Sequence, residues 1–443
     1  MTSEQVKSKI QSDGIEYFLC SFVEMGGAPK AKLVPATNFD EMSTDGAGFA
    51  GFAAGHLGQG PHDTDIMSIP DFRSLSILPW RPNIAWLAGN LHVDGQAWPY
   101  CPRTILCQQL DRAKQQGYTL NVGVEPEFML LKQTEGQYHP WDLNDRLEKP
   151  CYDLRALNRN LDLMTRIIGY MQQLNWGPYA NDHEDANCQF EINWAYSDAL
   201  TTADRNIFYR WMVRTIAEEE GLWATFMPKP FANLTGNGTH YHLSLWDIDS
   251  QENLFLDPSD KLGLSETARW FMGGLLHHAK ALTAITSPLV NSYKRLTRGS
   301  PSSGASWAPV YVTHGPSNRT QMIRVPGPGR IENRTPDGAA NPYLACAVTL
   351  AAGLDGIERK IEPGKPNDQN LYEASEDELR KQKIEVLPDT LHDAINELDK
   401  DDVIKEALGR QYADYYIEVK RDEWARYHQS VSQWETENYL LVH

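Results

Sequence analysis

Two glutamates, Glu125 and Glu127, interrupt an otherwise apolar run in the segment TLNVGVEPEFMLLK, residues 119–132. Such a run is typical of a buried β-strand, in which residues i and i+2 point to the same face. The two carboxylates should therefore converge, and two buried like charges are costly unless a cation neutralises them. Lys or Arg partners and metal ions are the candidates. A solvent-exposed strand end carrying salt bridges is an alternative that this segment alone leaves open.

Charged or metal-binding side chains recur in three further strand-like segments. The segments are NDHEDANCQFEINW with Glu184 and Glu191, GNGTHYHLSLW with His240, His242 and Ser244, and GRIENRTPD with Arg330, Glu332 and Arg334. Each segment alone has a simpler interpretation, either packing histidines or a ladder of Glu–Arg ion pairs. Together they offer five glutamates and one or two histidines, and one shared cluster explains these more economically than several separate burials.

The chemistry of this set favours hard divalent cations. Carboxylate oxygens with a minority of imidazole nitrogens suit Mg²⁺ or Mn²⁺ rather than structural zinc. Five glutamates exceed the needs of one ion, so the pattern indicates two or more. Several divalent ions beside arginines indicate phosphoryl transfer. The sequence has no GxxxxGK[ST] phosphate loop and no dinucleotide-binding fingerprint, so any ATP must bind to another architecture.

The pattern of predicted helices and strands changes near residue 103, where we place a domain boundary. Short strand-like runs fill residues 1–102, together with a Gly-rich stretch at 46–63 that predicts a long loop. Strands and helices alternate from 103 to 443. One amphipathic helix each is predicted in LRALNRNLDLMTRIIGYMQQLN and TTADRNIFYRWMVRTIAEEEG. Further helices are predicted in ETARWFMGGLLHHAKALTAIT and ANPYLACAVTLAAGLDGIERKI, and a closing helix in YADYYIEVKRDEWARYHQ. Residues 363–400 are polar and predict a surface excursion.

Composition narrows the class of protein. The 443 residues are 41% hydrophobic and 23% charged, as in an ordinary globular protein, and the net charge of −18 disfavours nucleic acid and anionic membranes as partners. No apolar run is long enough for a transmembrane helix, and the N-terminus lacks the apolar core of a signal peptide. The six scattered cysteines form no CxxC pair, so we expect reduced thiols and a cytoplasmic location.

The motifs, in this order, resemble those of the glutamine synthetase superfamily. They are GVEPEF, HEDANCQFE, KPFANLTGNGTHYHLS, NSYKRL and GRIENRTPDGAANPYL, within a resemblance that runs from about residue 15 to about residue 365. The resemblance implies an α+β fold, with a β-grasp domain at 1–102 and, at 103–443, a catalytic domain with a curved antiparallel sheet and flanking helices. It also implies ATP, two or three Mg²⁺ or Mn²⁺ ions, L-glutamate and an amine. The expected assembly is a hexamer or dodecamer with active sites between subunits.

The resemblance also assigns roles by position. Glu127, Glu184 and Glu191 would bind one ion, and Glu125, His240 and Glu332 a second. Gly236, Arg295 and Arg334 would bind glutamate, with Arg295 and Arg334 also meeting the transferring phosphate. His242, Ser244, Lys229, Arg319, Arg324 and Arg330 would lie at ATP. Tyr152, Phe52 and Trp307 would contact substrate, and Glu184 and Asp185 join the catalytic set.

Two departures from the family pattern concern the amine. Where the family's N-terminal loop has Phe-Asp-Gly-Ser-Ser, this sequence has Phe-Ala-Gly-Phe-Ala, so Ala50 stands for the Asp. In the loop TRGSPSSGASWAPV, Trp307 stands where the family has Glu before Ala-Pro. Aromatic faces suit an alkylammonium ion. The pattern resembles the branch that contains γ-glutamylmethylamide synthetases and type III-like enzymes, and it favours methylamine.

Three alternatives remain open from the sequence. Other carboxylates, such as Asp185, Asp63 or Asp65, could take over the missing role and make the enzyme a true glutamine synthetase. Glu184, Asp185 or His56 could deprotonate the amine. An inactive structural homologue is disfavoured, because all six presumed metal ligands and the arginines are present.

Overall fold

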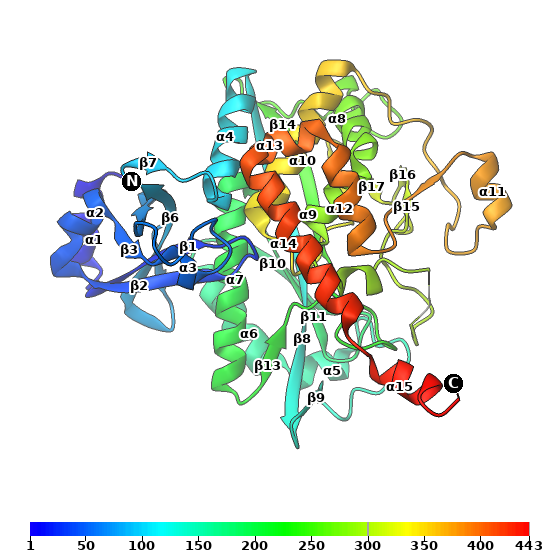
Figure 1. Cartoon of the computed structure of the whole chain (residues 1–443), viewed down its shortest axis with the longest axis horizontal. Coiled ribbons are helices and arrows are strands. Elements are labelled where there is room, and N and C mark those ends of the chain that lie inside the picture. The colour runs from blue at the N-terminus through cyan, green and yellow to red at the C-terminus, as the bar shows by residue number, and fades with distance from the viewer. Residues whose placement is uncertain (299–300, 443) are drawn as a thin grey trace.

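A seven-stranded sheet forms the N-terminal layer of the computed structural model, which describes residues 1–298 and 301–442. The strands run in the order β2-β1-β6-β4-β3, with β5 and β7 also paired to β6, and the β1–β6 pair is parallel. Figure 1 shows this layer in blue at one side of the molecule. Its elements are α1 (Ser3–Ser12), β1 (Tyr17–Val23), β2 (Pro29–Pro35), α2 (Phe39–Asp45), β3 (Ala47–Phe49), α3 (Gly51–Ala54), β4 (Ile66–Pro70), β5 (Ser76–Leu78), β6 (Arg81–Val93) and β7 (Gln96–Ala97).

A ten-stranded sheet forms the centre of the larger part. Its order is β10-β11-β8-β14-β18-β17-β16, and β9, β12 and β13 also pair with β8. The strands are β8 (Tyr118–Thr134), β9 (Gln137–Pro140), β10 (Pro178–His183), β11 (Gln189–Trp194), β12 (Ser197–Asp198), β13 (Trp223–Thr225), β14 (Thr239–Asp247), β16 (His314–Pro316), β17 (Ile323–Gly327) and β18 (Arg330–Asn333). A separate pair joins β15 (Tyr311–Val312) to β19 (Glu385–Val386). The predicted antiparallel sheet is correct except for β16–β17, which is parallel.

Most helices of the larger part pack around this sheet and the buried helix α10 (Pro342–Arg359), whereas α11 (Glu376–Lys381) packs beside β15 and β19 and α15 (Gln433–Tyr439) buries no residue. The others are α4 (Pro102–Gln115), α5 (Leu154–Arg159), α6 (Leu161–Gln173), α7 (Ala199–Glu219), α8 (Glu266–His277), α9 (Ala279–Thr286), α12 (Leu391–Lys400), α13 (Asp402–Leu408) and α14 (Arg410–Gln429). Small residues allow close helix packing here. A Cβ on Gly274 of α8 would lie 2.0 Å from the carbonyl oxygen of Ala352 in α10.

Four sequence predictions of local structure are wrong in detail. The Gly-rich stretch 46–63 is not all loop, because β3 pairs with β4 and α3 follows it. One predicted helix breaks at Asn160, whose amide accepts a hydrogen bond from the Trp141 indole. Another predicted helix breaks at His278, whose two ring nitrogens form hydrogen bonds with the carboxylates of Asp401 and Asp355. The segment 363–400 contains the well-buried helix α12, whose apolar residues recur at helical spacing (Leu391, Ala394, Ile395, Leu398).

A buried arginine links the N-terminal layer to the larger part. The Arg103 guanidinium, at the start of α4, forms ion pairs at 2.9 Å with Asp204 of α7 and with Asp71, which follows β4. It also donates to the Asn90 side chain of β6 at 3.1 Å. One cluster of buried apolar residues lies wholly in the N-terminal layer, and the larger cluster extends from the larger part to Val23, Trp86 and Ala88 of that layer. The division between residues 102 and 103 remains a prediction. None of the described helices is both long and apolar enough to cross a membrane.

Candidate active site

Strand register aligns acidic and imidazole side chains across the centre of the large sheet. On β8, Glu125 lies opposite His240 of β14, and Glu127 lies opposite Glu191 of β11. One strand further, His242 of β14 lies opposite Glu332 of β18. Residues directly opposite on neighbouring strands project from the same face. Four separate segments of the sequence thus deliver their functional side chains to one place.

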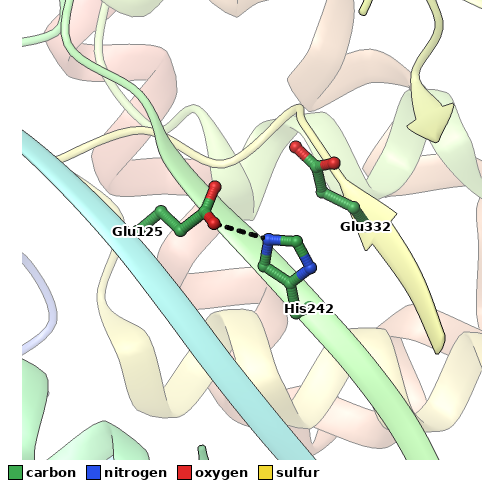
Figure 2. Close-up of side chains that lie close together, drawn as sticks. All are labelled: Glu125, His242 and Glu332. Carbon is green, nitrogen blue, oxygen red and sulfur yellow. Dashed lines mark ion pairs between the residues drawn. The ribbon is translucent and has the colours of Figure 1, made fainter. Parts of the chain in front are cut away.

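Figure 2 shows part of this cluster, in which Glu125, His242 and Glu332 point toward one another. The Nε2 atom of His242 lies 2.9 Å from a Glu125 carboxylate oxygen. The Nδ1 atom of His240 lies 3.6 Å from Glu125 and 3.8 Å from Glu332, and its Nε2 atom lies 3.9 Å from Glu127. Both ring nitrogens of His242 are buried, and neither has a hydrogen-bond partner of good geometry among the described residues.

Repulsion among carboxylates makes the other half of the cluster unfavourable without a cation. Burial, together with the neighbouring charges of Glu125, Glu184 and Glu127, raises the pKa of Glu191 well above its usual range. Burial and the charges of Glu127 and Asp182 likewise raise the pKa of Glu184. Divalent cations would relieve both costs.

The donor set fits magnesium or manganese. Three groups of side chains could each hold an ion: Glu125, His242 and Glu332; Glu125, Glu191 and His240; and Asp182, Glu184 and Glu191. All six side chains assigned to metal by resemblance lie in or beside these groups. Their division between two ions, and the identity of the metal, remain predictions.

Asp182 is a member of this cluster that the sequence analysis missed. It lies on β10 directly opposite Glu191 of β11. Burial and the charges of Glu125 and Glu127 raise its pKa to about 6. A sequence signal existed, because Asp182 precedes Glu184 by two residues in NDHED, as Glu125 precedes Glu127.

Arginines surround Glu332 at the opposite edge of the cluster. The Arg324 guanidinium lies 2.8 Å from one oxygen of Glu332, and Arg334 forms an ion pair with the other oxygen. These cations outweigh burial and lower the pKa of Glu332 to about 2. The buried Arg295 donates to the carbonyl groups of Arg334 and Thr335 at 3.0 Å. The Nε atoms of Arg324 and Arg334 are buried without a hydrogen-bond partner among the described residues, so both side chains retain donors for a ligand.

Gly236 occupies a position where a side chain does not fit. A Cβ there would lie 2.3 Å from the carbonyl oxygen of Pro228 and 3.2 Å from the Arg295 side chain. The Gln189 amide fixes the backbone by donating to the Gly236 carbonyl at 2.9 Å and to Glu127 at 3.2 Å. The backbone at Gly236 is therefore tied directly to the carboxylate cluster.

A cavity of about 270 Å³ opens beside Glu125 and His242. Ser244 and Arg330, both assigned to ATP, line it, and so do Tyr196 and Trp246. Aromatic walls with one cation suit a nucleotide base and its phosphates. Three other residues assigned to ATP are outside this lining. The Lys229 ammonium donates a hydrogen bond to the Leu234 carbonyl, Arg319 is exposed, and Arg324 pairs with Glu332.

The aromatic residues assigned to substrate are exposed. Tyr152 is 69% exposed, Phe52 60% and Trp307 39%. Tyr152 and Trp307 also adopt left-handed backbone conformations, with φ of 64° and 55°. Such strain in non-glycine residues is concentrated at functional sites. Phe52 lies on α3 in the N-terminal layer, apart from the cluster.

The loop before Trp307 is tied to the acidic cluster through Asp185. One oxygen of Asp185 accepts hydrogen bonds from the Thr235 and Ser303 hydroxyls. The Ser302 amide and hydroxyl both donate to the Asn233 carbonyl at 3.0 Å. Residues 299–300 of the predicted long loop lie outside the described part of the chain. The described part of this loop is held in place, and one oxygen of Asp185 is already engaged.

The fold and this cluster define the class of protein. The sequence matches the glutamine synthetase catalytic domain family over residues 99–439, and the chain belongs to the glutamine synthetase family. It is an ATP-dependent carboxylate–amine ligase, and the family's substrates are glutamate, ATP and an amine, with divalent metal.

Individual relatives cover almost the whole chain. The glutamine synthetase of Rhizobium meliloti (strain 1021) is 45% identical, over 97% of each chain. The glutamate–methylamine ligase of Methyloversatilis universalis is 44% identical, over 99% of each chain. A solved GmaS/ADP complex superposes with a TM-score of 0.92 at 49% identity, over 98% of each chain. This confirms the predicted glutamine synthetase fold.

Proposed function

We propose that this protein is a glutamate–methylamine ligase. It joins the γ-carboxylate of L-glutamate to methylamine and forms γ-glutamylmethylamide, ADP and phosphate. A free carboxylate reacts poorly with an amine because its leaving group would be oxide. Transfer of the γ-phosphoryl group of ATP to the carboxylate gives an acyl phosphate, and the amine then displaces phosphate.

Different residues of the chain bind and orient the different substrate groups. Arg295 and Arg334 orient glutamate and the transferring phosphoryl group, while Arg319, Arg324 and Arg330 neutralise the phosphates of ATP. Two or three Mg²⁺ or Mn²⁺ ions, when bound to the carboxylate cluster, supply further positive charge. Gly236 lets the backbone approach the amino group of glutamate closely.

The observation that favours methylamine over ammonia as the amine substrate is Trp307, whose side chain is exposed. Its carbonyl accepts a hydrogen bond from Arg334 at 3.0 Å, so its backbone lies next to a proposed substrate-binding group. Ala50 replaces the second expected carboxylate. An indole face attracts an alkylammonium ion and contacts its methyl group, whereas bare ammonium needs several hydrogen-bond acceptors. A buried methyl group is worth about 1–1.5 kcal/mol, which gives roughly a five- to tenfold preference.

The names of the relatives point to two different amine substrates, methylamine and ammonia. The Methyloversatilis universalis enzyme is named for methylamine and supports the proposal, as does the likeness to the GmaS structures. The Rhizobium meliloti enzyme, at similar identity, is named a glutamine synthetase and favours ammonia. Both amines are mostly protonated near neutral pH, so either needs a base. Glu184, Asp185 and His56 are the candidates.

The deciding experiment measures amine-dependent phosphate release with glutamate, ATP and Mg²⁺ or Mn²⁺. Methylamine, ammonia and ethylamine are compared by kcat/KM. We expect methylamine to be preferred over ammonia by roughly tenfold. A preference for ammonia would instead identify a glutamine synthetase.

We also propose that the active form is a ring of six subunits, single or stacked, with each site shared between neighbours. Phe52, which is 60% exposed on α3 of the N-terminal layer and is not a member of the carboxylate cluster, supports this assembly. It would reach the site of the next subunit.

A further inference from the structure

Tyr372 contacts the loop that carries Trp307 from a segment distant in sequence. Its hydroxyl donates a hydrogen bond to the Ala308 carbonyl at 3.1 Å. The preceding carbonyl, that of Trp307, accepts from the Arg334 guanidinium at 3.0 Å. Two different side chains thus hold two consecutive carbonyl groups, that of the Trp307–Ala308 peptide and that of the peptide after it.

The segment that carries Tyr372 is itself fixed to the strand that follows this loop. β19 pairs with β15, with Val386 opposite Tyr311. Leu371 and Leu379 form a small buried apolar cluster with Tyr311 and Val310. Tyr372 therefore has a defined position relative to residues 307–312. Figure 1 shows α11, which follows Tyr372, projecting from the edge of the molecule.

Trp307 needs such support because its conformation is unfavourable. Its φ of 55° lies in the left-handed region, where a bulky side chain is strained unless its surroundings hold it. Its side chain is 39% exposed, so packing alone constrains it weakly. The hydrogen bonds to its own carbonyl and to that of Ala308 are therefore the main restraints visible on this peptide.

Tyr372 is chemically suited to this restraint. Burial raises the pKa of its hydroxyl, although a hydrogen bond with Ser306 lowers it in part. A raised pKa favours the protonated hydroxyl, which is the form that donates to the Ala308 carbonyl. It also lies within electrostatic range of Arg334 and Arg295.

We propose that Tyr372 is a positioning residue that selects the amine by holding Trp307 in place through the Ala308 carbonyl. The inference rests on the proposed function, because it assumes that Trp307 contacts the amine. It adds a determinant of specificity on a segment outside the central sheet. Tyr372 itself does not need to touch any substrate.

The test is Tyr372→Phe, which removes only the hydroxyl, in the intact full-length enzyme. We expect KM for methylamine to rise about fivefold, the worth of one hydrogen bond, with kcat and the KM values for glutamate and ATP little changed. KM for ammonia should change less than twofold. The matched control is Tyr416→Phe, which removes a hydroxyl that donates to the buried Ala284 carbonyl at 2.7 Å. It should leave amine selectivity unchanged.

A second readout does not depend on activity. With 5-fluorotryptophan in all 13 tryptophan positions, the ¹⁹F resonance of Trp307 is assigned by its loss in Trp307→Phe. Tyr372→Phe should shift or broaden that resonance, and Tyr416→Phe should not. An unchanged resonance together with unchanged selectivity would overturn the role of Tyr372.

The outcomes separate this inference from the proposed function. If the wild-type enzyme prefers ammonia, the proposed function fails. The role of Tyr372 is then tested by comparing Tyr372→Phe with the wild type in KM for ammonia and in the ¹⁹F resonance of Trp307. If the wild type prefers methylamine and Tyr372→Phe matches it in both readouts, only the inference about Tyr372 fails.

Discussion

Glu127 of β8 and Glu191 of β11 lie directly opposite each other, and both side chains are at least nine-tenths buried. Neither has an Arg or Lys ion pair among the described residues. Asn193 donates to Glu191 at 2.9 Å, and Gln189 and the Gly238 amide donate to Glu127. These neutral donors reduce the repulsion without supplying positive charge. The pair is therefore a site that favours cations even before substrate binds.

Glu191→Gln should separate metal binding from folding. In metal-free protein we expect the variant to be more thermally stable than the wild type, because one of two repelling carboxylates is gone. Mg²⁺ or Mn²⁺ at about 100 times its Kd should stabilise the wild type by about 2.7 kcal/mol and the variant much less. Phosphate release should be abolished, as it should in Glu127→Ala and Glu191→Ala.

Thermal unfolding with and without metal checks this prediction. The control is Glu358→Gln, at a carboxylate whose side chain is 70% exposed, and it should behave as the wild type. Equal metal stabilisation in Glu191→Gln and wild type, with activity retained, would remove Glu191 from the metal site.

Trp307→Ala should reduce the preference for methylamine over ammonia by roughly tenfold, since it removes the surface that distinguishes them. The measurement is kcat/KM for both amines. Trp223→Ala serves as the control, because Trp223 is similarly exposed, at 45%, on β13. Equal losses for both amines in Trp307→Ala would mean that Trp307 does not form the amine pocket.

Gly236→Ala should raise KM for glutamate strongly, because the new methyl group would displace the backbone that Gln189 ties to Glu127. The required movement is large, since the Pro228 carbonyl would be 2.3 Å away. Gly169→Ala is the matched control. It lies within α6 with nothing within 4 Å of its Cβ position, so it should be neutral or stabilising by about 0.5–1 kcal/mol. An unchanged glutamate KM in Gly236→Ala would exclude the proposed backbone contact.

His278 should make stability depend on pH. Burial lowers its pKa, but hydrogen bonds to Asp401 at 2.6 Å and Asp355 at 3.0 Å outweigh burial and raise the pKa overall. A raised folded pKa stabilises the protein fully below the unfolded value of about 6.5, and this contribution is lost as pH rises through the folded value. His278→Gln should cost about 3 kcal/mol near pH 6, because two carboxylates lose their cation.

The measurement is denaturant unfolding of both proteins across pH 5.5–9. The stability difference should narrow as pH rises above about 6.5. A constant difference over the whole range would show that His278 is not charged in the folded protein. Asp355 also pairs with Arg359 at 2.8 Å, so some compensation remains in the variant.

Mixing subunits tests the shared site. Glu127→Ala subunits lack a metal ligand, and Phe52→Asp subunits carry a charge on the exposed face of α3. Each homogeneous preparation should have little activity. Mixed rings should regain part of it, because some sites would combine an intact Glu127 with an intact Phe52. Activity in a monomer, or no recovery on mixing, would contradict a site between neighbours.

The central strands could be predicted from the sequence because their signals are local. Alternating charged residues in apolar runs predicted β8, β11, β14 and β18, and motif order predicted the fold. Contacts between distant segments were not predictable in this way. The helix break at His278 depends on Asp355 and Asp401, which lie 77 and 123 residues away. The contact of Tyr372 with Ala308 spans 64 residues and leaves no periodic trace in the sequence.

The cysteines have a practical consequence for labelling. All six are free thiols, and four of them are buried. Burial raises the pKa of Cys20 and Cys107 to about 11, and that of Cys151, Cys188 and Cys346 to about 12. Because the thiolate is the reactive form, alkylating dyes and mild oxidants should attack these positions slowly at neutral pH. A cysteine introduced at an exposed loop position would then react first, and a fluorophore could be attached there without removing the native thiols.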